Sequence, residues 1–422
     1  MPSGRPELFK GEHKMKEVEK SVFNGINIVS FAWAVVGPLT MKYFADYGAR
    51  VIRIESSTYP DANRLNAPMK DGRSGFNRSG YYNYYNSNLY SMLLNMSHPK
   101  AMDIVKRLVA KADVVMENFA SGVMERWGLG YEALKKIKPD IILLRQSGFG
   151  SYGPYARLPA FGMTLAGLTG IPNFIGSPED MPLPVGVAAY TDCICPRFAT
   201  AALIAALDYR NKTGRGQVLD LSQFETGLYF IIPAILEYVA NGKEPMRAGN
   251  TCAFAVPHNV YRCKGHDRWC AIAVINTEQW ESFCKVIGNE KLIKHPKYGT
   301  FQARKKNEEA LDAITNAWTQ QYTAEEVMEK MQSAGVPAGV VKNAADIFED
   351  PQLRLRQLFW PLQHPEVGLF THLGQAFQLS ETPAQARMPS PCLGEHTSEI
   401  CTEFLNMSDE EFVQLQNEGV FE

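Results

Sequence analysis

Apolar strands and amphipathic helices alternate through the first third of this chain, and this alternation restricts the possible folds more than any other feature. Residues 25–56, GINIVSFAWAVVGPLTMKYFADYGARVIRIES, contain a predicted strand, a Gly-Pro turn, a helix and a second strand. Further strands are predicted at 89–96, 113–119 and 140–148, with helices at 98–112 and within 122–139. A crossover helix joins parallel strands, so the pattern predicts an α/β chain with a doubly wound, Rossmann-like sheet.

Changes in composition along the sequence suggest five segments. A polar leader occupies 1–22, the large domain is predicted over 23–225, and a linker helix follows at 226–245. A smaller α+β domain is predicted over 246–340, where short strands and charged amphipathic helices follow one another. We expect residues 341–422 to return to the large domain.

The composition is that of an ordinary globular protein. Hydrophobic residues make up 45% and charged residues 21%, and the formal net charge is −2, so we expect no nucleic acid or membrane partner. The N-terminal segment is charged and lacks an apolar stretch, which favours a cytoplasmic protein. The eight cysteines lack paired CxxC spacing, so we expect free thiols and no metal site.

The first predicted turn lacks the motifs that hold dinucleotides and phosphates. SFAWAVVGPLTM contains neither G-x-G-x-x-G nor G-x-x-x-x-G-K-[ST]. Those glycines allow the backbone to approach a phosphate closely. NAD-dependent and P-loop chemistry are therefore disfavoured.

Asp192 stands six positions before Phe198, the first residue of the apolar run Phe198–Leu207, which predicts a helix buried on nearly all sides. Thr191 or Asp192 is a suitable N-cap for that helix. A carboxylate at a helix N-terminus is also kept ionised by the free backbone N–H groups, as an anionic nucleophile would have to be. The local sequence leaves both interpretations open.

Two further motifs also have two interpretations. NKTGRGQ surrounds Gly214 with Lys212 and Arg215, as expected either at an ordinary helix C-terminus or at an anion site. Glu117–Phe119 closes a predicted strand at the carboxyl edge of the sheet, where ligands of α/β proteins bind, and Arg126 follows it. Arg126 suits a phosphate contact or a plain surface position.

Several of these segments together resemble a known family. VVGPLTMKYFADYGARVIRIE, LNMSHPKA, ADVVMENF followed by MERWGLGYEAL, QSGFGSYGP, AYTDCICPRFA, RNKTGRGQ and LGEHT stand in the order and spacing of class III CoA-transferases. This is the formyl-CoA and carnitine CoA-transferase (CaiB/BaiF) family, and the resemblance covers roughly residues 23–405. Within this family, the overall sequence character of the chain most resembles the benzylsuccinate CoA-transferase type.

The resemblance implies an acyl-exchange enzyme with Asp192 as the nucleophile. The carboxylate would attack a donor thioester, giving an aspartyl mixed anhydride and CoA thiolate, and the thiolate or the acceptor carboxylate would complete the exchange. CoA thioesters are then substrates, and no cofactor is bound permanently. The donor expected from the narrower match is succinyl-CoA, with a bulky or aryl-substituted dicarboxylate such as benzylsuccinate as acceptor.

The resemblance also assigns binding residues. It places the CoA contacts at Ala34, Val35, Ser56, Leu94, Asn118, Phe119, Ala120 and Arg126, and the acyl substrate at Phe161, Gly162 and Gly249. The alternative interpretation of Leu94 and Phe119 is that they are plain core residues. The chain departs from the family at Leu89-Tyr90, where a Lys-Arg pair is common, and at Phe161-Gly162, where the formyl-CoA enzymes carry Tyr-Glu, and it lacks their glycine run.

The family further implies an interlocked homodimer, or a heteromer with a paralogous subunit. Two other functions share the scaffold. An acyl-CoA racemase would need a histidine before Glu117, and the nearest, His98, belongs to a predicted helix start. A catalytically silent subunit would have no need to keep Asp192.

Overall fold

A computed structural model describes residues 21–186 and 189–422. The leader predicted at 1–22 lies outside the described residues except for its last two positions. The chain forms two compact units, the first from residues up to 171, 184–233 and 355–422, the second from 172–183 and 234–354. Residues 172–183 thus belong to the second unit, although the sequence pattern placed them within 23–225.

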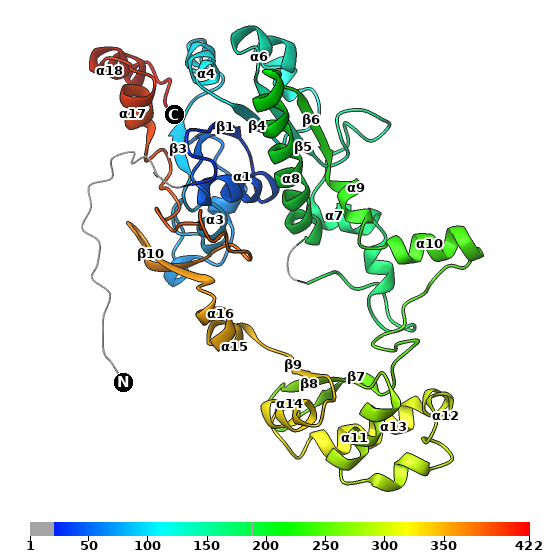
Figure 1. Ribbon diagram of the computed structural model, residues 1–422. Coiled ribbons are helices and arrows are strands. Elements are labelled where there is room, and N and C mark those ends of the chain that lie inside the picture. Colours follow the sequence, from blue (N-terminus) through cyan, green and yellow to red (C-terminus); the bar gives the residue numbers. More distant parts are fainter. Residues whose placement is uncertain (1–20, 187–188) are drawn as a thin grey trace. The chain divides into compact units, whose positions relative to one another are not determined.

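A six-stranded parallel sheet forms the centre of the first unit (Figure 1). Its strands are β1 (Asn27–Phe31), β2 (Arg50–Glu55), β3 (Tyr90–Leu93), β4 (Val114–Glu117), β5 (Ile142–Ser147) and β6 (Val218–Ser222). They lie in the order β3-β2-β1-β4-β5-β6, and every neighbouring pair is parallel. The predicted doubly wound α/β fold is confirmed.

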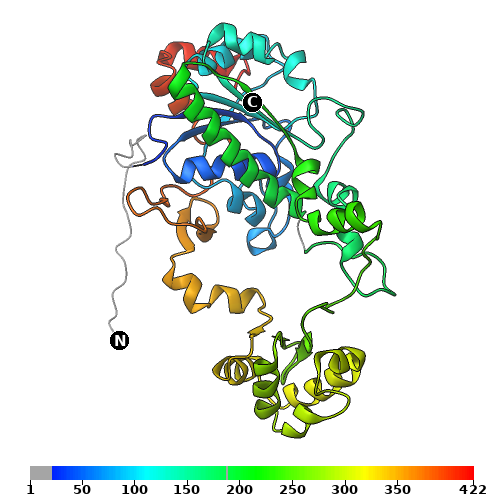
Figure 2. The same cartoon turned by 45° about the vertical axis from the view of Figure 1, so that its right-hand side comes forward.

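Helices cover both faces of this sheet (Figure 2). The helices α1 (Val36–Asp46) and α8 (Tyr190–Thr213) share one apolar core, while α4 (Ala101–Ala110) and α6 (Tyr131–Ile137) share the other. Successive strand residues point to opposite faces, so Ile28 joins the α1 core and Val29 the α4 core. Burial on both faces explains why the strands are almost continuously apolar.

Shorter elements complete the first unit. They are α2 (Ala62–Leu65), η1 (Lys70–Gly72), α3 (Gly80–Tyr85), α5 (Val123–Arg126), α7 (Gly162–Leu168), α9 (Gln223–Leu228), the antiparallel pair β10 (Phe359–His364) and β11 (Gly368–Leu373), α17 (Thr397–Glu399), η4 (Ile400–Phe404) and α18 (Asp409–Asn417). The last segment packs Ile400 and Leu415 into the α4 core.

The second unit is a small α+β assembly. Strands β7 (His258–Arg262), β8 (Trp269–Ala273) and β9 (Ala338–Val340) form an antiparallel sheet. One face of it is covered by helices, and Trp280, Phe283 and Leu311 centre their shared core. The helices are α11 (Thr277–Val286), η3 (Glu290–Lys294), α12 (Phe301–Lys306), α13 (Glu308–Thr319) and α14 (Ala324–Ser333), with α15 (Ala344–Phe348) and α16 (Pro351–Leu355) after β9. The elements η2 (Ile171–Phe174) and α10 (Ile232–Asn241) stand where the chain passes between the units.

Helix α8 is less buried than predicted, because one of its sides is exposed. Its inner residues, such as Leu203, are fully buried against the sheet. On the outer side, Phe198 is 37% exposed, Ile204 45% and Tyr209 43%. In a single chain the helix is therefore not buried on nearly all sides, because the described residues of the first unit leave these side chains exposed.

The end of α8 follows the ordinary interpretation of NKTGRGQ. Gly214 caps the helix with a left-handed φ of 70°, which glycine adopts without strain. A Cβ at Gly216 would lie 1.9 Å from the Ile141 carbonyl oxygen, so the second glycine is required by close backbone contact. Both glycines have structural roles.

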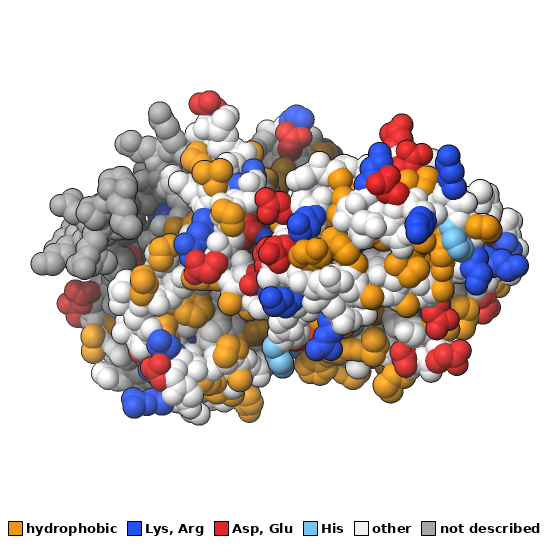
Figure 3. Space-filling model, turned by 90° about the horizontal axis from the view of Figure 1, so that it is seen from below, with side chains coloured by type: hydrophobic (Ala, Val, Ile, Leu, Met, Phe, Trp, Pro, Cys, Tyr) orange, Lys and Arg blue, Asp and Glu red, His pale blue; other side chains and the backbone are white. Residues whose placement is uncertain are grey.

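Surface and cysteine chemistry also match the composition. Figure 3 shows apolar, acidic and basic side chains interspersed over the face that it presents, in keeping with the small net charge. The eight cysteines are free thiols, as predicted. Among the described residues, no helix combines the length and apolar character needed to cross a bilayer.

Candidate functional site

The predicted binding residues gather at the carboxyl edge of the six-stranded sheet. Strand order reverses between β1 and β4, and in open α/β sheets the crevice outside this reversal is the usual ligand site. Ala34 and Val35 follow β1, Ser56 follows β2, Leu94 follows β3, and Asn118 begins the segment after β4. Because parallel strands end at one edge, the topology brings these five positions to the same side of the sheet.

Asn118 joins the two strands at the reversal. Its Oδ1 accepts the backbone N–H of Trp33 at 2.7 Å, and its Nδ2 donates to the Trp33 carbonyl at 2.9 Å. One side chain thus satisfies both backbone groups of a turn residue. The amide fixes the turn after β1 relative to the end of β4.

The turn after β1 is strained. Ala34 has a φ of 57°, a conformation that residues with a Cβ seldom adopt. Its N–H is held by Asp61 Oδ2 at 3.0 Å, and Asp61 in turn forms a buried ion pair with Arg53. Sequence analysis missed Asp61 and Arg53, which carry no recognisable motif.

Glu55, at the end of β2, is fully engaged by its own chain. It forms an ion pair with Arg64 at 2.8 Å and accepts a hydrogen bond from Ser91 Oγ at 2.6 Å. Burial alone would raise its pKa, but the charges of Arg64 and Arg53 and these hydrogen bonds outweigh burial and hold the pKa at about 2. With its oxygens occupied, Glu55 stabilises the edge of the sheet.

The other predicted CoA positions have different environments. Leu94 is 1% exposed and belongs to the α4 core, as its alternative interpretation held. Phe119 is half-buried, with its ring edge-on to Trp127 at 5.4 Å, and Ala120 is exposed. Arg126 is exposed on α5. Contact between these residues and CoA remains a prediction.

Asp192 is not the cap of its helix. Helix α8 begins at Tyr190, Ala189 occupies the N-cap position, and no side chain caps the helix. Asp192 therefore lies inside the first turn, and its carboxylate is directed at another element. Its Oδ1 accepts a hydrogen bond from Gln223 Nε2, at the start of α9. The capping interpretation is wrong for this residue.

The Asp192 carboxyl has an unusual pKa. Burial raises it from 3.8 to about 6, and the hydrogen bond from Gln223 offsets part of that rise. In the described part of the chain, no Lys or Arg side chain forms an ion pair with it. Such a perturbed, unpaired carboxylate is typical of functional sites.

Gly162, the first residue of α7, lies against this carboxylate. A Cβ built on it would lie 2.8 Å from Asp192 Oδ2 and 2.9 Å from Oδ1. Phe161 precedes it and is 77% exposed. The structure therefore brings Phe161 and Gly162 to Asp192, while Gly249 lies in the second unit, with its N–H donating to the Gly176 carbonyl at 2.9 Å.

Sequence analysis missed two polar residues at strand ends. Gln223 follows β6 directly, and Glu117, which closes β4, was quoted without a role of its own. Burial raises the pKa of Glu117 to about 7, although its hydrogen bond from Phe119 N–H and the charge of Arg145 oppose the rise. For Glu117 the available signal was its place at the carboxyl end of the strand predicted at 113–119. No strand was predicted at 218–222, so Gln223 had no such signal.

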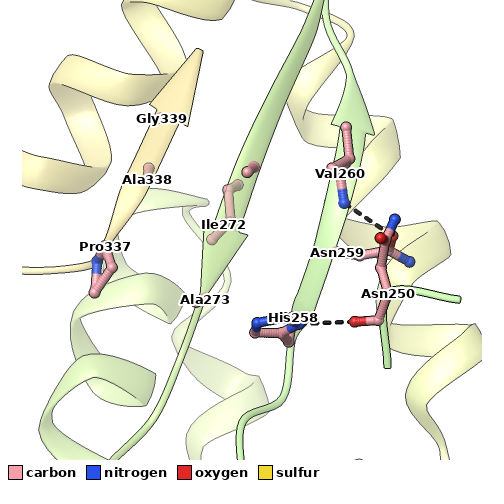
Figure 4. A pocket seen from close by; sticks show the side chains of 10 residues that line it. Asn250, His258, Asn259, Val260, Ile272, Ala273, Pro337, Ala338 and Gly339 are labelled. Atoms are coloured by element: carbon pink, nitrogen blue, oxygen red, sulfur yellow. Dashed lines mark hydrogen bonds between the residues drawn. The ribbon is translucent and has the colours of Figure 1, made fainter. Parts of the chain in front are cut away.

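A cavity of about 320 Å³ lies in the second unit, on the open face of its sheet (Figure 4). Ala271, Ile272 and other small apolar residues line it. Its polar side chains bind one another or backbone: Asn250 Nδ2 donates to Asn259 Oδ1 at 3.0 Å, and His258 Nδ1 contacts the Asn250 carbonyl at 2.7 Å. These contacts hold the Asn250 and His258 side chains in the lining of the cavity, and the predicted site residues Phe161, Gly162 and Asp192 do not line it.

Comparison with known proteins gives a consistent result. The family model described as CoA-transferase family III matches residues 23–397. Succinyl-CoA:D-citramalate CoA-transferase of Chloroflexus aurantiacus is 31% identical over 397 residues, covering 94% of this chain and 97% of that protein. The beta subunit of succinyl-CoA:L-malate CoA-transferase from the same organism is 29% identical, covering 94% and 97%.

A solved structure agrees with these sequence matches. The crystal structure of a CaiB/BaiF family protein from Brucella suis superposes with a TM-score of 0.84 at 30% identity, covering 91% of this chain and 100% of that one.

Proposed function

The chain belongs to CoA-transferase family III and is a CoA-transferase, and from this premise we propose that it moves CoA from succinyl-CoA to a dicarboxylic acid through an anhydride on Asp192. The observation that carries the proposal is the environment of Asp192. Its carboxylate is half-buried, free of ion pairs among the described residues, and packed against a glycine. A capping or structural aspartate needs none of these features.

The reaction begins with the ionised carboxylate. An oxygen of Asp192 attacks the thioester carbonyl carbon, the carbon–sulfur bond breaks, and its electron pair leaves on sulfur as CoA thiolate. The product is a mixed anhydride between Asp192 and the donor acyl group. An anhydride is at least as reactive as a thioester, so the acyl group stays activated and the exchange runs in both directions without ATP.

CoA is proposed to bind across the crevice between β1 and β4. The strained turn at Ala34 and Val35, held by Asn118 and Asp61, forms one wall of it. Arg126 is proposed to bind a phosphate, which its exposure supports, since a guanidinium can donate two parallel hydrogen bonds to phosphate oxygens. Ser56 already accepts the N–H groups of Thr58 and Tyr59 at 3.2 and 3.3 Å, so it shapes its loop as well.

The acceptor is proposed to be a dicarboxylate. The relatives named above use succinyl-CoA with citramalate or malate. Phe161 exposes an apolar ring next to Gly162, which leaves room for an acyl group with a bulky or aryl substituent, benzylsuccinate included. Gly249 is proposed to contact the acyl substrate, as the family resemblance implies.

A second copy of the chain is proposed to cover the outer stripe of α8, formed by Phe198, Ala201, Ile204, Ala205 and Tyr209. These residues are exposed although most are apolar, and Tyr229, whose ring lies 5.1 Å from that of Phe198, is 59% exposed beside them. Apolar surface of this kind marks a protein interface. Because one relative is a beta subunit, a paralogous partner is the alternative occupant.

The test is a trapping experiment. The purified chain is incubated with succinyl-CoA without acceptor, treated with hydroxylamine or borohydride, and the peptide spanning Leu183 to Arg197 is examined by mass spectrometry. We expect a modification on Asp192 and none in Asp192→Asn, which should also lose more than tenfold in kcat/KM. An unmodified wild-type peptide would contradict the proposal. If the peptide is unmodified and solvent deuterium enters the acyl α-carbon, the protein would be a racemase. If the peptide is unmodified and no reaction occurs, the chain would be a silent subunit.

A further inference from the structure

The buried amide of Gln223 lies at the candidate site, and the reaction proposed above gives it no role. Gln223 is the first residue of α9, directly after β6, and only 5% exposed. Ser222 caps α9 by accepting the Glu225 N–H at 3.2 Å, so the Gln223 side chain is not needed as a cap. Its carboxamide instead turns toward the start of α8.

The orientation of this carboxamide is determined by its partners. Nε2 donates to Thr191 Oγ1 at 3.1 Å and to Asp192 Oδ1. A carboxylate only accepts hydrogen bonds, so the amide nitrogen, not its oxygen, faces Asp192. Thr191 is fully buried and uses the second N–H, which fixes the amide in this orientation.

The hydrogen bond makes the two oxygens of Asp192 unequal. Oδ1 is held by Gln223, whereas no described residue hydrogen-bonds Oδ2. Both oxygens lie near the position that a Cβ of residue 162 would occupy, at 2.8 Å for Oδ2 and 2.9 Å for Oδ1, and glycine leaves space there, so only the hydrogen bond from Gln223 distinguishes them. An amide also carries no charge, so it orients the carboxylate without the ion pair that would weaken its attack.

We propose that Gln223 is a second catalytic residue: its Nε2 holds Oδ1 of Asp192, leaves Oδ2 to attack the thioester, and stays bonded to Oδ1 when that atom becomes the carbonyl oxygen of the acylated aspartate. This inference rests on the proposed transfer through Asp192.

Gln223 should have its greatest effect on the rate in the later steps, in which Cγ of Asp192 is attacked. After Oδ2 has formed the anhydride, CoA thiolate attacks Cγ of Asp192 and negative charge develops on Oδ1. The Cγ–Oδ2 bond then breaks, the donor leaves as its carboxylate with Oδ2, and an aspartyl thioester remains. An acceptor carboxylate attacks Cγ in turn, releasing thiolate, which takes the acyl group and returns one oxygen to Asp192. In each attack on Cγ, the Gln223 N–H faces the developing oxyanion, and loss of one such donor costs roughly 10²–10³ in kcat.

The test compares Gln223→Met, which keeps the volume and removes the donor, with wild type. We expect kcat/KM to fall about 100-fold. The acid limb of its pH profile, near 6 in wild type, should move to higher pH, because burial raises the Asp192 pKa and the lost hydrogen bond no longer opposes it. A purely structural role would lower the melting temperature without moving this limb.

Thr226→Val is the matched control. Thr226 lies on the same helix, is buried, and donates to the Gln223 carbonyl at 2.9 Å without touching the carboxylate. It should lose stability but keep the wild-type pH profile. If Gln223→Met does not fold, the isosteric Gln223→Glu takes its place and should move the acid limb further upward, since a second carboxylate repels the first.

The outcomes separate the two proposals. Suppose that wild-type Asp192 is trapped but Gln223→Met keeps a kcat/KM within threefold of wild type and an unmoved acid limb. This result overturns the role of Gln223 and leaves the proposed function standing. No adduct on wild-type Asp192 overturns the proposed function itself. An adduct in wild type with a slow, alkaline-shifted Gln223→Met enzyme supports both.

Discussion

Adding a single methyl group at Gly162 should damage the site while leaving the rest of the fold in place. The Cβ of Gly162→Ala would lie 2.1 Å from Ala189 Cβ and under 3 Å from both Asp192 oxygens, at 2.8 and 2.9 Å. Contacts this short do not persist, so the start of α7 or the first turn of α8 must shift. Overpacking of this kind costs about 1–3 kcal/mol, and a nucleophile displaced by about 1 Å loses roughly 100-fold in rate.

The assay is steady-state transfer from succinyl-CoA, with a thermal melt of the same preparation. We expect Gly162→Ala to lower kcat/KM by roughly 100-fold and the melting temperature by several degrees. Gly167→Ala is the control, because it adds the same methyl group to the same helix where a Cβ meets nothing within 4 Å. It should keep full activity and gain about 0.5–1 kcal/mol of stability, as replacing a helical glycine with alanine does. The reasoning fails if Gly162→Ala retains more than half of the wild-type kcat/KM.

Three further perturbations have defined outcomes. Burial and the charge of Lys42 lower the pKa of His372 from 6.5 to about 3, so stability that is complete above pH 6.5 should fall as the pH drops toward 3. In urea melts, His372→Leu should flatten that loss, whereas replacement of the exposed His266 by Gln should not. Arg126→Ala should raise KM for CoA esters about tenfold with kcat nearly unchanged, the effect of losing a charged hydrogen bond of about 1.5 kcal/mol; an unchanged KM would remove it from the site. Ile204→Glu should convert the proposed dimer to a monomer in analytical ultracentrifugation, and a wild-type sedimentation profile would contradict the proposed interface.

The sheet could be predicted because its signal is local. Ile28 and Val29 are both apolar because each serves a different core, and the crossover helices are amphipathic because each covers one face. From strand order alone, the ends of β1 and β4 become the expected binding edge. The family resemblance then located Asp192, which periodicity by itself left undecided.

The chemistry of Asp192 depends on contacts that the local sequence does not contain. Whether it caps α8 is decided by the residue at which the helix begins, and that is Tyr190, two positions earlier. Gln223 stands 31 positions further along the chain and meets Asp192 only after β6 has been added to the sheet. Gly162 reaches the carboxylate from the other direction. Helix and strand propensities carry no information on such contacts between residues that are far apart in the sequence.

Burial, the lack of an ion pair among the described residues and the hydrogen bond from Gln223 all affect one property, the basicity of the Asp192 carboxylate. An ordinary aspartate is fully ionised at neutral pH but weakly nucleophilic, and an ion pair would lower its basicity further. Burial raises the pKa to about 6, which in the proposed mechanism makes the oxygen a better nucleophile while most of the carboxylate is still ionised at pH 7. Without Gln223 the same burial would carry the pKa higher and protonate the nucleophile. A neutral donor on one oxygen therefore sets the balance that the proposed exchange of acyl groups between Asp192 and a thiolate requires.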